Sequence, residues 1–184
     1  MGRTQATQEV YELPPDHGWT AREGYKVLVL DRGAVVLEFP SAWHMQVGPH
    51  QIDIRDQPSP EQSTCVLAVS YLRLPPVDWT GLPLSRLVLD ALEGDDRERI
   101  GVAPMVETNR SGLEVACLDL RVMDQVERRE ACSRLCLARG NRIQCLITFD
   151  YWPQEETRLL PVWDNVLDSL RLGATGSRQP SPPQ

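Results

Sequence analysis

The chain has 184 residues, of which 41% are apolar, and it carries a formal net charge of −7 at pH 7. A chain of this size and composition can fill the core of one domain without disulfide or metal support. Binding to nucleic acid or to an anionic membrane surface needs clustered Lys and Arg, so the acidic balance argues against both. The sequence also lacks an apolar run of roughly 20 residues, the length of a membrane span. Its start has no signal-peptide run, and we therefore expect a cytoplasmic protein.

The two ends of the chain are poor in core-forming residues. Residues 1–22 mix polar residues with "LPPDHG", and residues 174–184 read "ATGSRQPSPPQ". Such segments cannot bury enough apolar surface to offset the entropy of ordering. We predict an N-terminal arm over 1–22, a single domain over 23–173 and a disordered tail over 174–184.

The first half of the domain alternates apolar runs with turn residues. Two β-branched runs, 25–31 and 34–39, are joined by Arg-Gly and predict a hairpin. The stretch 51–56 is short and half polar, which is typical of an edge strand. In contrast, 63–74 is apolar on both faces, as in a strand that is covered on both sides. Apolar residues recur at helical spacing over 84–94, and the final glycine of this stretch is a helix stop.

The second half predicts a series of strands and one closing helix. We expect the strands over 103–109, 113–124, 129–140 and 142–152, with a tight turn at "RGNR" between the last two. In "TRLLPVWDNVLDSLRLG" the apolar residues form one helical stripe. Pro161 fits only the first turn of that helix, and Gly173 suits the position just past its end. About seven strands and two helices predict an α+β domain with an antiparallel central sheet.

The stretch "VVLEFPSAW" marks the end of an early strand. Val35, Leu37 and Phe39 share one face of the strand at period two. Pro40 removes a donor from the strand ladder, so it ends the strand or lies at an edge. Trp43 then lies where the emerging loop can fold back over the core. We interpret the stretch as a strand end with an aromatic plug rather than as a ligand pocket.

Two segments of the chain together indicate a known fold. "AVVLEFPSAWHM" is similar to the early strand, proline and tryptophan of the PsbP-like fold family, and "GNRIQCLITFDYWPQEETRLLPVWDNVLDSLRL" resembles its closing strand and helix. The resemblance covers roughly residues 24–173. It implies a sheet of six or seven strands with helices on both faces, an α/β/α sandwich. The family includes PsbP proteins of photosystem II, a Ran-binding import factor and bacterial DcrB-like and effector-adaptor proteins. Since these mostly bind partners, the resemblance implies a protein-binding module rather than an enzyme.

The cysteines include one spacing that resembles a metal motif, Cys132-x3-Cys136. On a helix the two thiols would share a face, but on the predicted strand four residues span about 13 Å. That distance is too long for two ligands of one zinc ion or for a disulfide. We therefore expect no metal site and interpret all five cysteines as small buried hydrophobes in a reducing compartment.

The remaining polar candidates lack a catalytic or metal-binding pattern. The three histidines lack an HExxH or CxxC partner, and the charged run 95–99 lacks a calcium-loop pattern, so we predict a solvated loop there. The sequence contains no GxSxG elbow, P-loop or GxGxxG motif. We therefore expect no enzymatic activity and no cofactor.

Aromatic residues near strand ends are the best candidates for partner contacts, because Tyr and Trp often anchor interfaces. Core packing is the alternative for each of them. The candidate ligand- or partner-binding residues are Trp43, His44, Trp79, Tyr151 and Trp152.

Three functional hypotheses follow. The first is a non-catalytic cytoplasmic adaptor that binds a protein partner. The second is a small-molecule-binding protein or weak hydrolase with a pocket near Trp43 and His44. The third is an accessory protein of a photosynthetic or electron-transfer complex, which follows from the resemblance alone.

Overall fold

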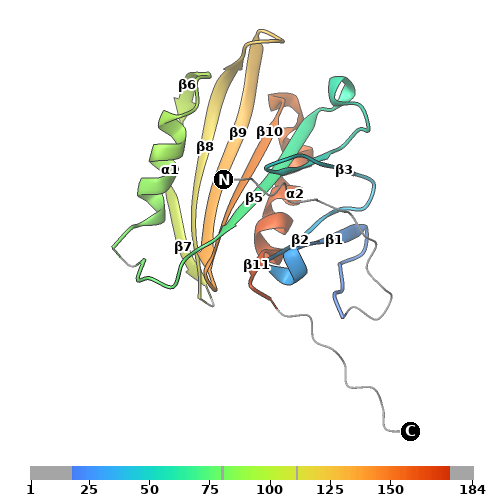
Figure 1. Ribbon diagram of the computed structural model, residues 1–184. Helices are drawn as coiled ribbons and strands as arrows, with labels where there is room; N and C mark the ends of the chain where they lie inside the picture. Colours follow the sequence, from blue (N-terminus) through green and yellow to red (C-terminus); the bar gives the residue numbers. More distant parts are fainter. Residues whose placement is uncertain (1–17, 80, 111, 175–184) are drawn as a thin grey trace, which may run out of the picture.

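The computed structural model describes residues 18–79, 81–110 and 112–174. In these segments it contains two β-sheets and two α-helices (Figure 1). The smaller sheet has the strand order β1-β2-β11. β1 and β2 form the predicted hairpin, in which Leu30 lies opposite Val35. The strands of this sheet are β1 (Tyr25–Leu30), β2 (Val35–Pro40) and β11 (Arg171–Leu172).

The larger sheet carries most of the domain. Its order is β3-β4-β5-β10-β9-β8-β6, β7 also pairs with β8, and these pairings are antiparallel. Asn141 and Arg142 both have positive φ between β9 and β10, which confirms the predicted tight turn. The strands are β3 (His44–Val47), β4 (Ile52–Arg55), β5 (Cys65–Arg73), β6 (Glu98–Val102), β7 (Val106–Arg110), β8 (Leu113–Asp124), β9 (Arg129–Gly140) and β10 (Ile143–Tyr151).

The two α-helices cover opposite faces of the larger sheet (Figure 1). α1 (Leu84–Glu93) packs on β8 and β9. α2 (Glu156–Ser169) follows the short 3₁₀ helix η3 (Pro153–Glu155) and packs on the other face together with the smaller sheet. The predicted α+β sandwich, an antiparallel sheet with helices on both faces, is thereby confirmed, and the sheet has eight strands among the described residues.

Each face of the larger sheet has its own core. On the α2 side, Phe149 is fully buried and its ring lies 6.1 Å from that of Trp43 and 5.9 Å from that of Trp163. On the α1 side, Val88 and its helical neighbours pack on the leucines and valines of β8 and β9. Alternation along β10 separates the two cores, since Ile147 faces α2 whereas Leu146 faces α1.

The stretch "VVLEFPSAW" has the predicted structure. Val35, Leu37 and Phe39 are all buried, and Pro40 is the last residue of β2. The amide of Trp43 then donates to the carbonyl of Pro40 at 3.0 Å, and the indole is buried in the core. This stretch is therefore an architectural corner with an aromatic plug.

Three predictions for the more polar segments differ from the structure. The stretch 51–56 contains β4, which lies inside the sheet between β3 and β5 rather than at an edge. The actual edge, β3, was expected to be loop, because its polar–apolar alternation runs over only four mostly exposed residues. The charged run 95–99 is not only solvated loop either. Glu98 and Arg99 begin β6, and Arg97 is half-buried.

The closing helix also differs from its prediction at both ends. α2 begins at Glu156, so Pro161 lies inside it rather than in its first turn. Thr157 and Pro161 are exposed, so water can donate to the carbonyl that lacks its amide partner. The helix ends at Ser169, and Gly173 follows β11 instead of capping the helix. A Cβ atom at Gly173, whose φ is +63°, would lie 2.6 Å from Cβ of Asn141, so both φ and space require glycine there.

Candidate binding groove beside helix α1

The α1 face of the larger sheet is only partly covered. α1 lies over β8 and β9, which leaves the same face of β5 and β10 without a covering helix among the described residues (Figure 1). The register places Leu146 between Leu137 of β9 and Ser70 of β5, so these three side chains share this face. Leu146 and Ser70 are partly exposed, and Leu72, two residues farther along β5, is 50% exposed.

A groove of about 400 Å³ lies between α1 and this open part of the sheet. That volume is within the usual range for sites that bind small molecules or short segments. Its walls are mostly apolar, with Ser70, Gln144 and His50 as polar groups. The lining residues are His50, Ser70, Tyr71, Leu72, Leu87, Val88, Ala91, Leu135, Leu137, Gln144 and Leu146.

The groove has polar groups that can take part in binding. His50 lies exposed in the turn between β3 and β4, and Ser70 lies on β5. Both residues line the groove, although they come from different elements. Their polar groups can donate to or accept from a bound molecule whose apolar part contacts the leucines.

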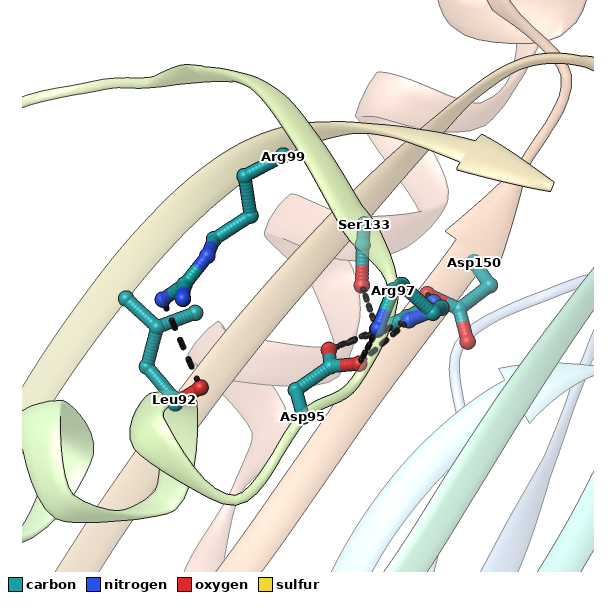
Figure 2. A network of polar contacts seen from close by, with 6 residues as sticks. All are labelled: Leu92, Asp95, Arg97, Arg99, Ser133 and Asp150. Atoms are coloured by element: carbon teal, nitrogen blue, oxygen red, sulfur yellow. Dashed lines mark hydrogen bonds and ion pairs between the residues drawn. The ribbon is translucent and has the colours of Figure 1, made fainter. Parts of the chain in front are cut away.

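A half-buried polar network anchors α1 beside the groove. Figure 2 shows the Arg97 guanidinium between two carboxylates. Its Nε and Nη2 donate to Asp95 at 2.7–3.0 Å, Nη1 donates to Asp150 of β10 at 3.2 Å, and Nη2 donates to Ser133 of β9 at 3.1 Å. These bonds tie the loop after α1 to the face of the sheet that forms the groove floor.

The network also changes the acidity of its members. The hydrogen bond from the Arg97 side chain is the main cause that holds the pKa of Asp95 below its usual value. The same hydrogen bond raises the pKa of Arg97 further above its ordinary value. Both groups therefore stay charged near neutral pH, which suits a structural clamp rather than an acid–base catalyst.

A second polar cluster lies on the opposite face, at the start of α2. The Tyr151 hydroxyl accepts from Nε of Arg134 at 3.2 Å and donates to Oε1 of Glu156 at 3.4 Å. Burial raises the pKa of Tyr151 to about 12. The hydroxyl thus remains protonated and satisfies a polar end inside the core.

The predicted site residues do not converge on one place. Trp43 and Tyr151 are buried on the α2 side, where both contact the ring of Phe149. His44 is exposed at the start of the edge strand β3. Neither Trp43 nor His44 lines the groove beside α1.

The other two aromatic candidates have local partners. Trp79 is partly buried before α1, and its Nε1 donates to the carbonyl of Pro75 at 3.3 Å. Trp152 packs at the edge of the α1-side core, and the guanidinium of Arg129 lies 3.4 Å from the centre of its ring. Their use in partner binding stays a prediction.

Sequence reasoning missed the groove residues because each has an ordinary local role. Leu87 and Ala91 belong to the predicted helix, and Leu146 belongs to the predicted strand. One signal of an uncovered face was available in the sequence. The alternating residues Gln144, Leu146, Thr148 and Asp150 make one face of β10 partly polar, which is unusual for a central strand that is covered on both sides.

The described residues contain no group of three or more His, Cys, Asp or Glu side chains placed to hold a metal ion. Within the same segments, neither helix has the length and apolar character needed to cross a membrane.

The arrangement of two sheets and two helices defines the PsbP-like fold. CyanoP, the cyanobacterial PsbP of Synechocystis sp. PCC 6803, superimposes with a TM-score of 0.54 at 13% identity, covering 84% of this chain and 98% of its own. LpqN of Mycobacterium tuberculosis, which is involved in cell envelope biogenesis, gives 0.56 at 11% identity over 80% and 90% of the two chains. A Bacteroides thetaiotaomicron protein gives 0.58 at 12% identity over 84% of this chain, which spans half the length of that protein. These likenesses establish the fold alone.

The family follows from the sequence match. Residues 26–175 match the Alr1449 family model, and the chain belongs to that family. The uncharacterized protein alr1449 of Nostoc sp. (strain PCC 7120) is 37% identical over 170 residues. That match covers 92% of this chain and 88% of the Nostoc protein.

Proposed function

We propose that this protein is a non-catalytic adaptor that holds a short apolar segment of a partner protein in the groove beside α1. The observation that carries this proposal is the groove itself, a mostly apolar space of about 400 Å³. A solvent-accessible apolar hollow in a stable domain is a common feature of binding proteins.

The lining chemistry favours an extended segment. Leu87, Ala91 and Leu146 offer apolar contacts, while the amide of Gln144 and the hydroxyl of Ser70 can bond to a peptide backbone. The net charge of −7 favours a partner of opposite charge, since complementary charge speeds association.

We further propose that the protein acts in the cytoplasm. All five cysteines are free thiols, which supports a reducing compartment.

A matched pair of substitutions tests the proposal. Leu72 lines the groove and is 50% exposed, whereas Leu89 does not line it and is 46% exposed. L72R and L89R add the same charge at similar exposure. We expect wild type and L89R, immobilised, to retain the same set of proteins from a lysate of the native organism, and L72R to lose at least one of them.

A second groove variant controls for an effect of L72R that is confined to its own strand. A91W places a large side chain in the groove from the exposed surface of α1. We expect A91W to lose the same protein as L72R. If both groove variants retain everything that wild type retains, the groove is not the partner site.

A small-molecule site is the second candidate, because the groove volume also suits a small ligand. This candidate concerns the groove rather than the surroundings of Trp43, whose indole is buried. Native mass spectrometry of the purified protein distinguishes the two. A bound small molecule that is present in L89R and absent from L72R would favour the second candidate over the adaptor.

A further inference from the structure

On the α2 face of the larger sheet, two of the cysteines lie directly across from each other on neighbouring strands. Cys117 of β8 and Cys136 of β9 are directly opposite each other in the antiparallel register. Both side chains point to the same face, since directly paired residues share a side of the sheet. Cys117 is half-buried and Cys136 is fully buried.

The geometry of this pair matches that of a disulfide. Directly opposite residues in an antiparallel pair have Cα atoms about 4.5–5.5 Å apart. Disulfides usually join Cα atoms about 4.4–6.8 Å apart. The two thiols are also close enough to shift each other's pKa. A bond between the two sulfurs therefore needs little movement of the backbone.

The other cysteines are placed less favourably. Cys145 lies opposite Ala138, so its relation to Cys136 is diagonal, at about 7–8 Å between Cα atoms. Cys132 lies about 13 Å along the same strand from Cys136. Cys65 of β5 is separated from β9 by β10. Of the five cysteines, only Cys117 and Cys136 face each other directly.

Access and charge assign different roles to the two sulfurs. Cys117 lies on β8 opposite Val106 of β7, which is 59% exposed, so a small reagent can approach from this side. The interaction with the Cys136 thiol lowers the pKa of Cys117 despite burial, and the positive charges of Arg134 and Arg110 act in the same direction. Burial and the neighbouring thiol raise the pKa of Cys136. Cys117 is therefore the attacking thiol and Cys136 the resolving one.

We propose that Cys117 and Cys136 form a reversible redox pair that is oxidised by low-molecular-weight disulfides. The Cys117 thiolate attacks one sulfur of the external disulfide, forms a mixed disulfide and releases one thiolate. The Cys136 sulfur then attacks the Cys117 sulfur, and its proton passes to the second thiolate, which leaves as a thiol. The two protein thiols are oxidised to one disulfide, and the external disulfide is reduced to two thiols. The new bond links β8 to β9 covalently.

Oxidation of the full chain with glutathione disulfide tests the pair. The reduced protein is incubated under native conditions, acid-quenched, alkylated and digested with trypsin. An arginine lies between every two consecutive cysteines, so each cysteine falls on its own peptide. We expect a linked peptide pair that contains Cys117 and Cys136, loss of two of the five free thiols, and full reversal by dithiothreitol.

Single substitutions test the order of the steps. C136S should stop at a glutathione adduct on Cys117, whereas C117S should keep its four thiols free. C145S should still form the linked pair. Circular dichroism checks that each variant is folded. The linked peptide pair expected from the wild-type protein does not depend on the variants. The proposal is overturned if the native protein keeps all five thiols, or if the linked peptides contain any other pair.

Discussion

Replacing Arg97 with methionine should destabilise the protein by about 2 kcal/mol. The guanidinium donates to Asp95, Asp150 and Ser133, and methionine keeps most of the aliphatic length while removing every one of these bonds. A hydrogen bond to a charged group contributes about 1.5–3 kcal/mol when it is buried. The Arg97 side chain is 31% exposed, so solvent screening reduces the sum of several bonds to about 2 kcal/mol.

The cost of R97M should depend on pH in a defined direction. The Arg97 hydrogen bond holds the pKa of folded Asp95 below its ordinary value of 3.8. The stabilisation is therefore complete above the unfolded pKa and is lost as the pH falls through the folded pKa. We expect the full cost at pH 7 and a smaller cost as the pH falls below about 4.

Urea unfolding followed by circular dichroism measures both effects. The midpoint of thermal unfolding should fall by about 4–8 °C at pH 7. Arg99 is the matched control, because it is two residues away and donates only one bond, at 3.5 Å, to the carbonyl of Leu92 (Figure 2). R99M should cost little. Equal losses of unfolding free energy for R97M and R99M, or a loss for R97M that does not change with pH, would refute the stabilising role of the Arg97 network.

Two further predictions concern buried groups. Asn165 of α2 is 2% exposed, and its side-chain nitrogen and oxygen have no hydrogen-bond partner among the described residues, so N165L should raise the free energy of unfolding by about 1 kcal/mol. N165D, the control, should lower it, and a loss of stability in N165L would show that the amide is satisfied. Burial raises the pKa values of Cys65 and Cys145 to about 12, so both thiols are neutral at pH 8. Iodoacetamide should therefore leave them unmodified in the native protein and modify them in urea, and rapid native labelling of either would contradict their burial.

The elements that sequence predicted well have strong periodic patterns. The strand 142–152 alternates buried and partly exposed residues, and β10 (Ile143–Tyr151) matches it within a residue at each end. The stripe containing Trp163 and Val166 correctly indicated α2. Weak patterns gave the errors, because β3 has exposed residues on both faces and β4 is only four residues long.

The candidate sites were not predictable in the same way. The groove joins Ala91 of α1 to Ser70 of β5 and Leu146 of β10, which are far apart in the sequence. The cysteine pair shows the same effect. Cys132 and Cys136 drew attention by their spacing, yet the neighbour of Cys136 is Cys117, nineteen positions earlier on another strand.

Local residue chemistry alone determined the class of fold. Apolar periodicity and turn residues were enough to indicate an α+β domain with an antiparallel sheet. The PsbP-like sandwich was implied by the resemblance of two segments to that fold family. Only the tertiary structure decided which side chains meet. Strand register and the placement of α1 over β8 and β9 set the groove, the Arg97 clamp and the facing thiols. Periodicity reports which face of an element is apolar, whereas pairing between distant strands depends on the packing of the whole domain.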